Sequence, residues 1–252
     1  MSPRYLVLWD VDHTLIETRG VGTALFGEAF TRVTGVPMRE LIKIPGLTEP
    51  DVLHRMLRLH DLTPTEQIFA RFAYELTALH EERIDLLRTR GRMLPGVERT
   101  LAELAGHPEV AQSVLTGNLR GVAAVKLDAF GLTRWVDLDA GAYGSDHRER
   151  AALVGIARAR AADRYGRDFP GPATVIVGDT PADVRTARTA GAAVVAVATG
   201  KSGAAELAAT APDQLLSDLA AVSPFFPVVA GAARAAMSGE RTGELPDGRV
   251  RA

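Results

Sequence analysis

A short apolar run followed by an acidic pair constrains the fold of this chain more than any other stretch. The apolar run Tyr5–Trp9 leads directly into Asp10 and Asp12, and Thr14 follows closely. A run of this length is typical of a buried central strand in a parallel sheet. Ligands of open α/β sheets bind beyond the carboxyl ends of the strands. We therefore expect both carboxylates to stand in a binding crevice.

The two neighbouring carboxylates indicate a bound cation. Like charges this close repel each other unless something positive lies between them or one of them is protonated. A divalent metal would remove the repulsion between Asp10 and Asp12. The alternative is an Asx or Thr turn, in which the same side chains satisfy the amides of the loop.

Composition excludes several classes of protein. The chain has 252 residues and is 46% hydrophobic, enough for one large domain or a core with a smaller companion. Its 29 basic and 31 acidic residues leave a net charge of -2, which indicates neither nucleic acid nor membrane as a partner. Cysteine is absent, so disulfides and thiolate metal sites are excluded. With neither a secretory signal nor a membrane-length apolar stretch, the sequence predicts a cytoplasmic protein.

Short apolar runs alternate with longer helical patterns, which is typical of βαβ units. The sequence therefore predicts an α/β fold with a doubly wound, Rossmann-like parallel sheet. The expected strands are Tyr5–Trp9, Val110–Leu115, Trp135–Ala140, Thr174–Val177 and Ala193–Ala198.

The stretch between the first two expected strands is far too long for one crossover helix. Apolar residues recur in it at three- and four-residue spacing, which predicts helices. These helices are expected over Val21–Val33, Glu49–His60 and Thr65–Thr89. We interpret residues 17–92 as an inserted helical domain and residues 1–16 and 93–222 as the core, with a helix from Val97 to about Ala105. The apolar pattern thins after Pro224, so residues 223–252 are expected to form a partly disordered tail.

Three further segments carry polar groups at or beyond expected strand ends. Thr116-Gly117-Asn118 follows an apolar pair, although the same residues also suit a plain turn. In Gly178–Asp183, helix capping explains Thr180, Pro181 and part of Asp183, but it leaves Asp179 without a structural duty. A cation between these segments is supplied by Arg148 or Arg150.

These four segments, in this order, resemble the haloacid dehalogenase-like hydrolase superfamily, and the resemblance extends from Tyr5 to about Leu219. It implies that Asp10 is the nucleophile and that Asp12 is the general acid and base, with a raised pKa. It further implies that Thr116, Gly117 and Asn118 bind phosphate. The helical insert would be a mobile cap that closes over the site.

The resemblance also implies a metal and a cation. Mg²⁺ would be bound by Asp10, by the backbone carbonyl of Asp12 and by Asp179, with Asp183 bound either directly or through an intervening ligand. The usual lysine motif is absent, so we favour Arg150 for the cation, with Arg148 as the second choice. Lys126 follows Thr116 too closely for this role and is expected on the intervening helix. His13 stands where the family usually has glycine.

The expected activity is Mg²⁺-dependent hydrolysis of a small phosphorylated metabolite, such as phosphoglycolate or a sugar phosphate, through an aspartyl-phosphate. A dehalogenase has no need of Asp12, and phosphonate cleavage in related enzymes lacks the second aspartate. A sugar-phosphate mutase and a non-catalytic phosphate-binding or sensing protein remain open alternatives. The protein is expected to be a monomer or a homodimer.

Two further segments are ambiguous. Ile44–Asp51 resembles a cap loop that faces the site in phosphoglycolate phosphatase-like members, but a helix start capped by Thr48 explains it equally well. Ala198–Ser202 resembles the end of a phosphate-binding P-loop, yet the required earlier glycine is Val195, so we reject a P-loop.

Overall fold

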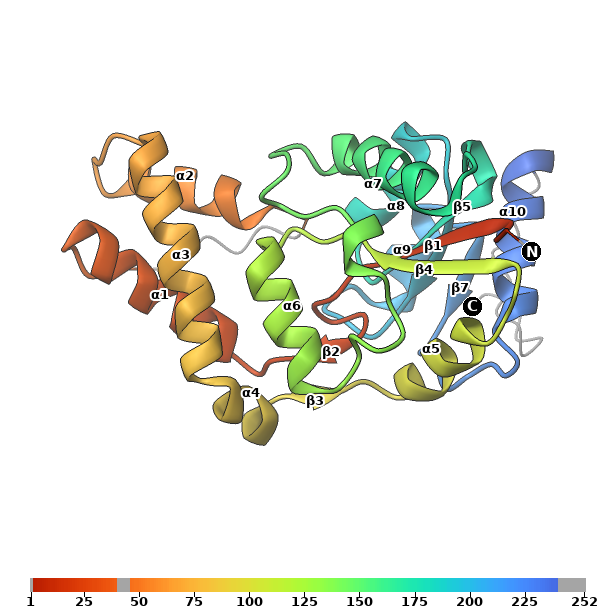
Figure 1. Cartoon of the computed structure of the whole chain (residues 1–252), viewed down its shortest axis with the longest axis horizontal. Helices are drawn as coiled ribbons and strands as arrows, with labels where there is room; N and C mark the ends of the chain where they lie inside the picture. The colour runs from red at the N-terminus through yellow and green to blue at the C-terminus, as the bar shows by residue number, and fades with distance from the viewer. Residues whose placement is uncertain (1, 40–45, 240–252) are drawn as a thin grey trace.

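The computed structural model describes residues 2–39 and 46–239. Its centre is a five-stranded parallel sheet in the order β4-β1-β5-β6-β7 (Figure 1). The α/β prediction and four of the five expected strands are confirmed. The strands are β1 Tyr5–Trp9, β4 Val110–Val114, β5 Thr174–Gly178, β6 Ala193–Val197 and β7 Gln214–Leu216.

Helices cover both faces of this sheet because its strands are apolar on both sides. In β1, Val7 and Trp9 point to one face, while Leu6 and Leu8 point to the other. The first face packs against α5 Val97–Ala105, α6 Arg120–Ala129 and α10 Phe226–Ser238. The second packs against α7 Arg150–Tyr165, α8 Pro181–Thr189 and α9 Ala204–Ala209.

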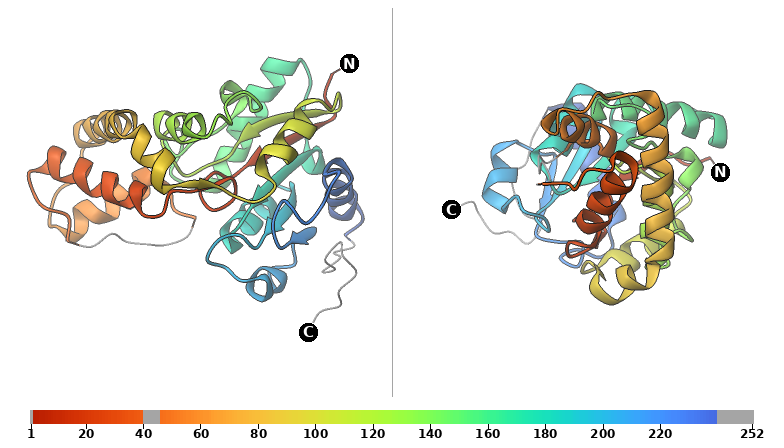
Figure 2. Two further views of the ribbon diagram at one scale, coloured as in Figure 1. Left: turned by 90° about the horizontal axis from the view of Figure 1, so that it is seen from below. Right: turned by 90° about the vertical axis from the view of Figure 1, so that its left-hand side faces the viewer.

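Four helices between β1 and β4 pack together beside the sheet, and we call them the helical insert. They are α1 Val21–Thr34, α2 Glu49–Leu59, α3 Glu66–Glu82 and α4 Ile84–Arg90. Their buried side chains form a hydrophobic cluster distinct from the two clusters on the sheet. Figure 2 shows the insert projecting from one end of the molecule. The chain enters and leaves it through the paired strands β2 Ile16–Glu17 and β3 Arg92–Met93.

Helix α6 joins the insert to the sheet. Ala123 and Leu127 on one side of α6 belong to the core cluster of the sheet. Leu119, Val122 and Ala129 on the other side belong to the cluster of the insert. In Figure 1 this helix accordingly lies between the sheet and the helical insert. Side chains of α6 can therefore contact both.

Two predictions about secondary structure are wrong. Trp135–Ala140 is not a strand: the chain there forms a loop and the 3-10 helix η1 Leu138–Ala140. The carboxylate of Asp137 accepts a hydrogen bond from Asp139 N and so starts η1. The expected helix Thr65–Thr89 is divided into α3 and α4 at Arg83.

The C-terminal tail, which we expected to be partly disordered, is helical over residues 226–238. This part of the expected tail is helix α10, whose residues Val228, Val229, Ala232 and Ala233 are buried. Phe225, directly before the helix, packs on the ring of Trp9 with their centroids 5.8 Å apart. Small alanine side chains bury well at helical spacing but give a weak apolar signal in the sequence. The expected disorder of residues 240–252 lies outside the described residues.

The short 3-10 helix η2 Gly171–Ala173 precedes β5. Within the described ranges, every helix is too short or too polar to cross a membrane.

Candidate active site

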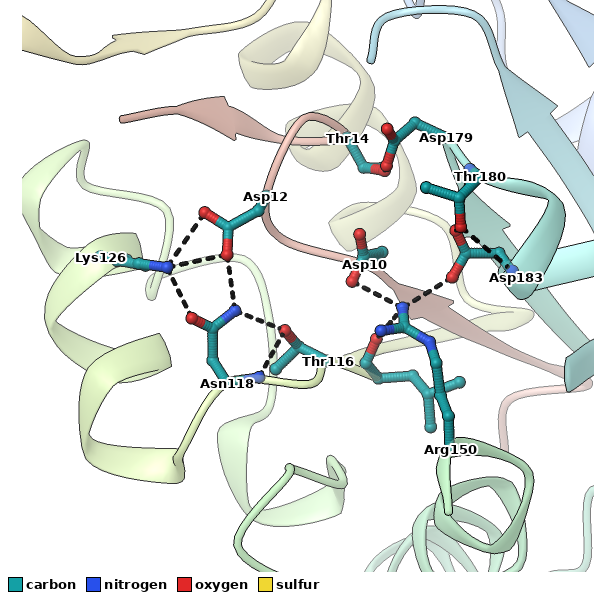
Figure 3. Close-up of polar contacts among 11 residues, drawn as sticks. Asp10, Asp12, Thr14, Thr116, Asn118, Lys126, Arg150, Asp179, Thr180 and Asp183 are labelled. Atoms are coloured by element: carbon teal, nitrogen blue, oxygen red, sulfur yellow. Dashed lines mark hydrogen bonds and ion pairs between the residues drawn. The ribbon is translucent and has the colours of Figure 1, made fainter. Parts of the chain in front are cut away.

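The polar residues predicted from the sequence meet at the carboxyl ends of the parallel strands. Figure 3 shows the polar contacts among them. They line a cavity of about 290 Å³. The helical insert contributes to the same cavity. The cavity is lined by Asp10, Asp12, His13, Gly46, Leu47, Glu49, Thr116, Gly117, Asn118, Arg150, Asp179, Thr180, Asp183, Lys201 and Ser202.

Asp10, Asp179 and Asp183 form a buried cluster of carboxylates. One oxygen from each lies within 4.8 Å of the others. Strand β1 delivers Asp10, whose backbone N–H donates to Val177 O of β5 at 2.9 Å. Asp179 follows β5 directly. Neighbouring parallel strands thus bring together carboxylates that are far apart in the sequence.

Asp183 has two duties. Its Oδ2 accepts hydrogen bonds from Thr180 N at 3.0 Å and Thr180 Oγ1 at 2.7 Å, which caps helix α8. Its Oδ1 faces Arg150 Nη2 at 2.6 Å. The capping role expected from the sequence is confirmed, and the second oxygen points into the carboxylate cluster.

Arg150 links two of the three acids. Its Nη2 donates to Asp10 Oδ1 at 2.7 Å as well as to Asp183. The side chain is 10% exposed, and its buried Nε has no hydrogen-bond partner among the described residues. Arg148 lies elsewhere: its guanidinium sits 5.0 Å from the ring centroid of Phe69 in the insert. Of the two candidate cations, only Arg150 lies in the carboxylate cluster.

The carboxylate cluster holds more negative charge than Arg150 neutralises. Burial raises the pKa of Asp10 from its ordinary value of 3.8 to about 7, and the negative charge of Asp183 adds to this effect. Burial and the charge of Asp10 raise the pKa of Asp179 to about 8. Such groups hold protons until another cation replaces them. Three convergent carboxylates with an unmet charge fit a divalent cation with oxygen ligands, such as Mg²⁺.

Asp12 stands apart from this cluster and is held by Lys126. Lys126 Nζ lies 2.7 Å from Asp12 Oδ2 and 3.0 Å from Oδ1. Burial would raise the pKa of Asp12, but the charge and hydrogen bonds of Lys126 and a hydrogen bond from Asn118 outweigh it and lower this pKa. The expectation of a raised pKa for Asp12 is therefore wrong for this form of the protein.

Lys126 lies on helix α6, as expected from the sequence, yet it belongs to the site. Its Nζ also donates to Asn118 Oδ1 at 2.5 Å. A lysine on a helix can contact the loop that precedes the helix, as Lys126 contacts Asn118 here. The number of residues between Thr116 and Lys126 did not reveal this contact. A single lysine in an otherwise apolar stretch of α6 was the available signal.

The Thr116–Asn118 loop is built from its own side chains. Thr116 is fully buried, and its Oγ1 accepts from Asn118 N at 3.2 Å and Asn118 Nδ2 at 2.7 Å. Asn118 Nδ2 also donates to Asp12 Oδ2 at 2.8 Å. Asn118 thus connects the loop predicted to bind phosphate to the Asp12 carboxylate.

Further residues complete the site, among them Thr14 of the first motif. Thr14 Oγ1 donates to Asp179 Oδ1 at 3.2 Å. The segment rejected as a P-loop also lies here, since Lys201 and Ser202 line the cavity. A Cβ at Gly200 would lie 1.7 Å from Asp179 Oδ2, so the close approach to this carboxylate requires glycine.

The loop around His13 has the backbone that its position requires. His13 has a φ of 63°, a left-handed conformation that is uncommon for residues other than glycine. Its backbone N–H donates to Ile16 O at 2.7 Å, and its carbonyl accepts from Thr199 Oγ1 at 2.6 Å. These bonds hold the loop between Asp10 and β2.

Both interpretations of the segment before α2 hold. Thr48 caps α2, because its Oγ1 accepts from Asp51 N at 3.3 Å. Gly46, Leu47 and Glu49 also line the cavity. Ile44 and Pro45, which belong to the expected cap loop, lie outside the described residues.

Comparison with solved structures identifies the fold. A predicted phosphoglycolate phosphatase from Haemophilus somnus 129PT superposes with a TM-score of 0.59 at 20% identity, covering 90% of this chain and 98% of that one. CbbY from Rhodobacter sphaeroides, solved with phosphate, gives 0.61 at 22% identity, with 87% and 96% covered. A proposed beta-phosphoglucomutase from Bacteroides vulgatus gives 0.60 at 15% identity, with 92% and 91% covered.

Sequence comparison is more specific. No curated protein matches the chain. The profile of the haloacid dehalogenase-like hydrolases, however, matches residues 7–188, which include every acidic residue of the site described above. Because this match spans most of the chain and agrees with the fold, the chain belongs to the haloacid dehalogenase-like hydrolase family.

Proposed function

We propose that this hydrolase is a Mg²⁺-dependent phosphatase that cleaves small phosphate monoesters through an aspartyl-phosphate on Asp10. One observation carries the proposal: two neighbouring aspartates of one loop stand in different electrostatic surroundings. Asp10 lies in the carboxylate cluster with Arg150. Asp12 is paired with Lys126 outside it. Two carboxylates with different surroundings suit two different chemical roles.

In the first step, a carboxylate oxygen of Asp10 attacks phosphorus, and the bond from phosphorus to the leaving oxygen breaks. Bound Mg²⁺, held by Asp10, Asp179 and Asp183 and by the backbone carbonyl of Asp12, would neutralise charge on the attacking and transferring groups. Arg150 adds positive charge at the same place, where its Nη2 already contacts Asp10 and Asp183.

The Thr116–Asn118 loop would position the transferring group. The Thr116 hydroxyl and the backbone amides after it lie at the end of β4, on the opposite side of Asp10 from the Asp179 segment. Positioning and charge neutralisation are most of what phosphoryl transfer asks of a protein. Asp12 would give a proton to the leaving alkoxide.

Lys126 requires an addition to this role of Asp12. The ammonium group favours the ionised carboxylate, which has no proton to give. Arrival of a phosphate dianion raises the proton affinity of a neighbouring carboxylate, so Asp12 would take up its proton together with the substrate. In the second step Asp12 accepts a proton from water, which attacks phosphorus and releases Asp10 and inorganic phosphate. The ionised form, which Lys126 favours, suits that second step.

The test is phosphate release from p-nitrophenyl phosphate and from a panel of small phosphorylated metabolites. We expect turnover that needs Mg²⁺, stops with a chelator, and is lost in Asp10→Asn. No phosphate release by the wild-type protein from any of these esters would refute the proposal. Conversion of a sugar phosphate into its isomer without phosphate release would instead identify a mutase. Phosphate binding without any conversion would identify a sensing protein.

A further inference from the structure

Glu49 brings the helical insert into direct contact with the loop that holds the proposed phosphate-binding residues. It is the first residue of α2, and its backbone N–H donates to Gly117 O at 2.7 Å. Its carboxylate Oε2 accepts from Leu119 N at 2.7 Å, at the start of α6. Main chain and side chain of one insert residue thus bind the same core loop.

This contact is close-packed. A Cβ added to Gly117 would lie 2.6 Å from Leu47 O and 3.1 Å from Thr48 Cα. A Cβ added to Gly46 would lie 2.3 Å from the Cβ of Ala182 on the core. Among residues 2–39 and 46–239, the insert lines the cavity only through Gly46, Leu47 and Glu49. Glu49 is the one ionisable group in that set.

Glu49 lines the same cavity as Asp12, and the charges of Lys126 and Asp12 act on its carboxylate. Burial raises the pKa of Glu49 to about 7, with Lys126 opposing the shift and Asp12 adding to it. Lys126 does not pair with Glu49, because its Nζ donates to Asp12 and Asn118. Within the described residues, Oε2 of Glu49 is used by Leu119 and Oε1 has no hydrogen bond.

The position and charge of the cavity residues determine which part of a bound phosphate ester can lie beside Glu49. Asp10, Thr116 and Arg150 occupy the phosphoryl end of the cavity, so the group next to Asp12 and Glu49 is the leaving group. A cavity of about 290 Å³ is at the small end of ligand sites. A hydroxyl or ammonium group there would donate to Oε1. A carboxylate there would face Oε1 of Glu49, an acceptor with no proton to donate when ionised, and would be repelled.

We propose that Glu49 selects phosphate monoesters whose leaving group carries a hydrogen-bond donor, a hydroxyl or an ammonium group, and rejects esters whose leaving group carries a carboxylate. This inference rests on the proposed phosphatase function. It deepens that function by naming the substrate class as the phosphates of small polyols or amino alcohols.

Four esters of nearly equal size test the selection. They are 2-hydroxyethyl phosphate, phosphoethanolamine, propyl phosphate and phosphoglycolate, with p-nitrophenyl phosphate as a reference ester. We expect kcat/KM for 2-hydroxyethyl phosphate, the hydroxyl ester, to be about 10-fold higher than kcat/KM for propyl phosphate. It should be about 100-fold higher than kcat/KM for phosphoglycolate. A higher value for phosphoethanolamine than for the hydroxyl ester assigns the selection to charge pairing, and the reverse order assigns it to hydrogen bonding.

Glu49→Gln tests the residue itself. Glutamine keeps an acceptor for Leu119 N and puts an amide donor in the position of Oε1, so the preference between the hydroxyl ester and phosphoglycolate should shrink about 10-fold or reverse. Glu66→Gln is the matched control, because Glu66 is also an acidic first helical residue of the insert but lies outside this cavity. Its preference should equal that of the wild type.

Calorimetric binding of the hydroxyl ester and phosphoglycolate to Asp10→Asn separates recognition from turnover. The affinities should differ in the same direction as kcat/KM. Equal or preferred use of phosphoglycolate, with p-nitrophenyl phosphate still hydrolysed, overturns this inference alone, as does an unchanged preference in Glu49→Gln. No hydrolysis of any ester overturns the proposed function, and this inference with it.

Discussion

Lys126 Nζ lies 2.7 Å from Asp12 Oδ2, and the lysine side chain is only 5% exposed. A buried ammonium group on α6 therefore fixes the carboxylate that we propose as acid and base. Since the opposite side of α6 packs on the helical insert, the same helix contacts the reacting groups and the insert.

Removing the ammonium group should leave Asp12 with the hydrogen bond from Asn118 alone and freer to change rotamer. For Lys126→Met we expect kcat/KM for an alkyl phosphate to fall about 100-fold. We also expect a loss of about 2 kcal/mol in the free energy of unfolding, less than for a fully buried pair because Asp12 is partly exposed. Denaturant unfolding of Lys126→Met, Asp12→Asn and the double variant measures the coupling. Strictly additive losses would show that the two side chains do not stabilise each other.

Arg150 and Arg148 should differ sharply when each is replaced by methionine. Arg150→Met removes the cation between Asp10 and Asp183, so we expect kcat to fall about 100- to 1,000-fold. Arg148→Met is the matched control, because Arg148 lies over Phe69, and its kcat should stay within about 3-fold of wild type. Steady-state kinetics of both variants decides the assignment, and a larger loss in Arg148→Met would reverse it.

The carboxylate cluster should make stability depend on pH in a way that Mg²⁺ reverses. The pKa of Asp10 is raised to about 7 and that of Asp179 to about 8, so the folded protein holds protons that the unfolded chain has lost above about pH 4. Without metal, the free energy of unfolding should therefore fall as pH rises from about 4 to about 8, and it should level off above pH 8. Buried His80, with its pKa lowered to about 4, acts in the opposite direction only below its ordinary value of 6.5.

Thermal unfolding with and without Mg²⁺ checks this prediction. Because Mg²⁺ binds the ionised carboxylates, its stabilising effect should be larger at about pH 8 than at about pH 6 by about 1 kcal/mol. Asp179→Asn should abolish most of the difference. A Mg²⁺ effect that is the same at both values of pH would contradict the assignment of these acids as the metal site.

Gly117 should be needed for the insert to reach the core. A methyl group at this position would meet Leu47 O at 2.6 Å, so Gly117→Ala should raise KM about 10-fold by weakening the approach of residues 46–49. Gly155→Ala is the control: a Cβ at Gly155, inside helix α7, meets nothing within 4 Å. That variant should keep its KM and gain up to about 1 kcal/mol of stability. Equal KM values for the two variants would show that the contact is not required.

The sequence predicted the parallel sheet and the site residues delivered by strand ends, because both depend on local patterns. An apolar run followed by a carboxylate identifies a strand and its binding end, as at Asp10 and Asp179. Neighbouring parallel strands then bring such residues together without further information.

Contacts made by helices could not be predicted in the same way. Lys126 reaches Asp12 only because α6 runs back along the site, and Glu49 reaches Leu119 only because the insert folds over it. The apolar periodicity of a helix does not reveal which way the helix runs relative to the site, so neither contact could be predicted from it. Asp137 shows the reverse failure: an apolar run with one acid suggests a strand, but the tertiary partners Arg164 and Tyr165 hold it in a loop. The low pKa of Asp12 was missed for the same reason, since its cause lies on another element.

The most direct test of the account is to trap the phosphorylated enzyme. The wild-type protein is mixed with Mg²⁺ and p-nitrophenyl phosphate, quenched in acid within the first turnover, digested and analysed by mass spectrometry. We expect a phosphoryl group on Asp10, in the peptide that also carries Asp12, and none in Asp10→Asn. A phosphoryl group on any other residue, or sustained turnover by Asp10→Asn, would contradict the central claim that Asp10 is the nucleophile.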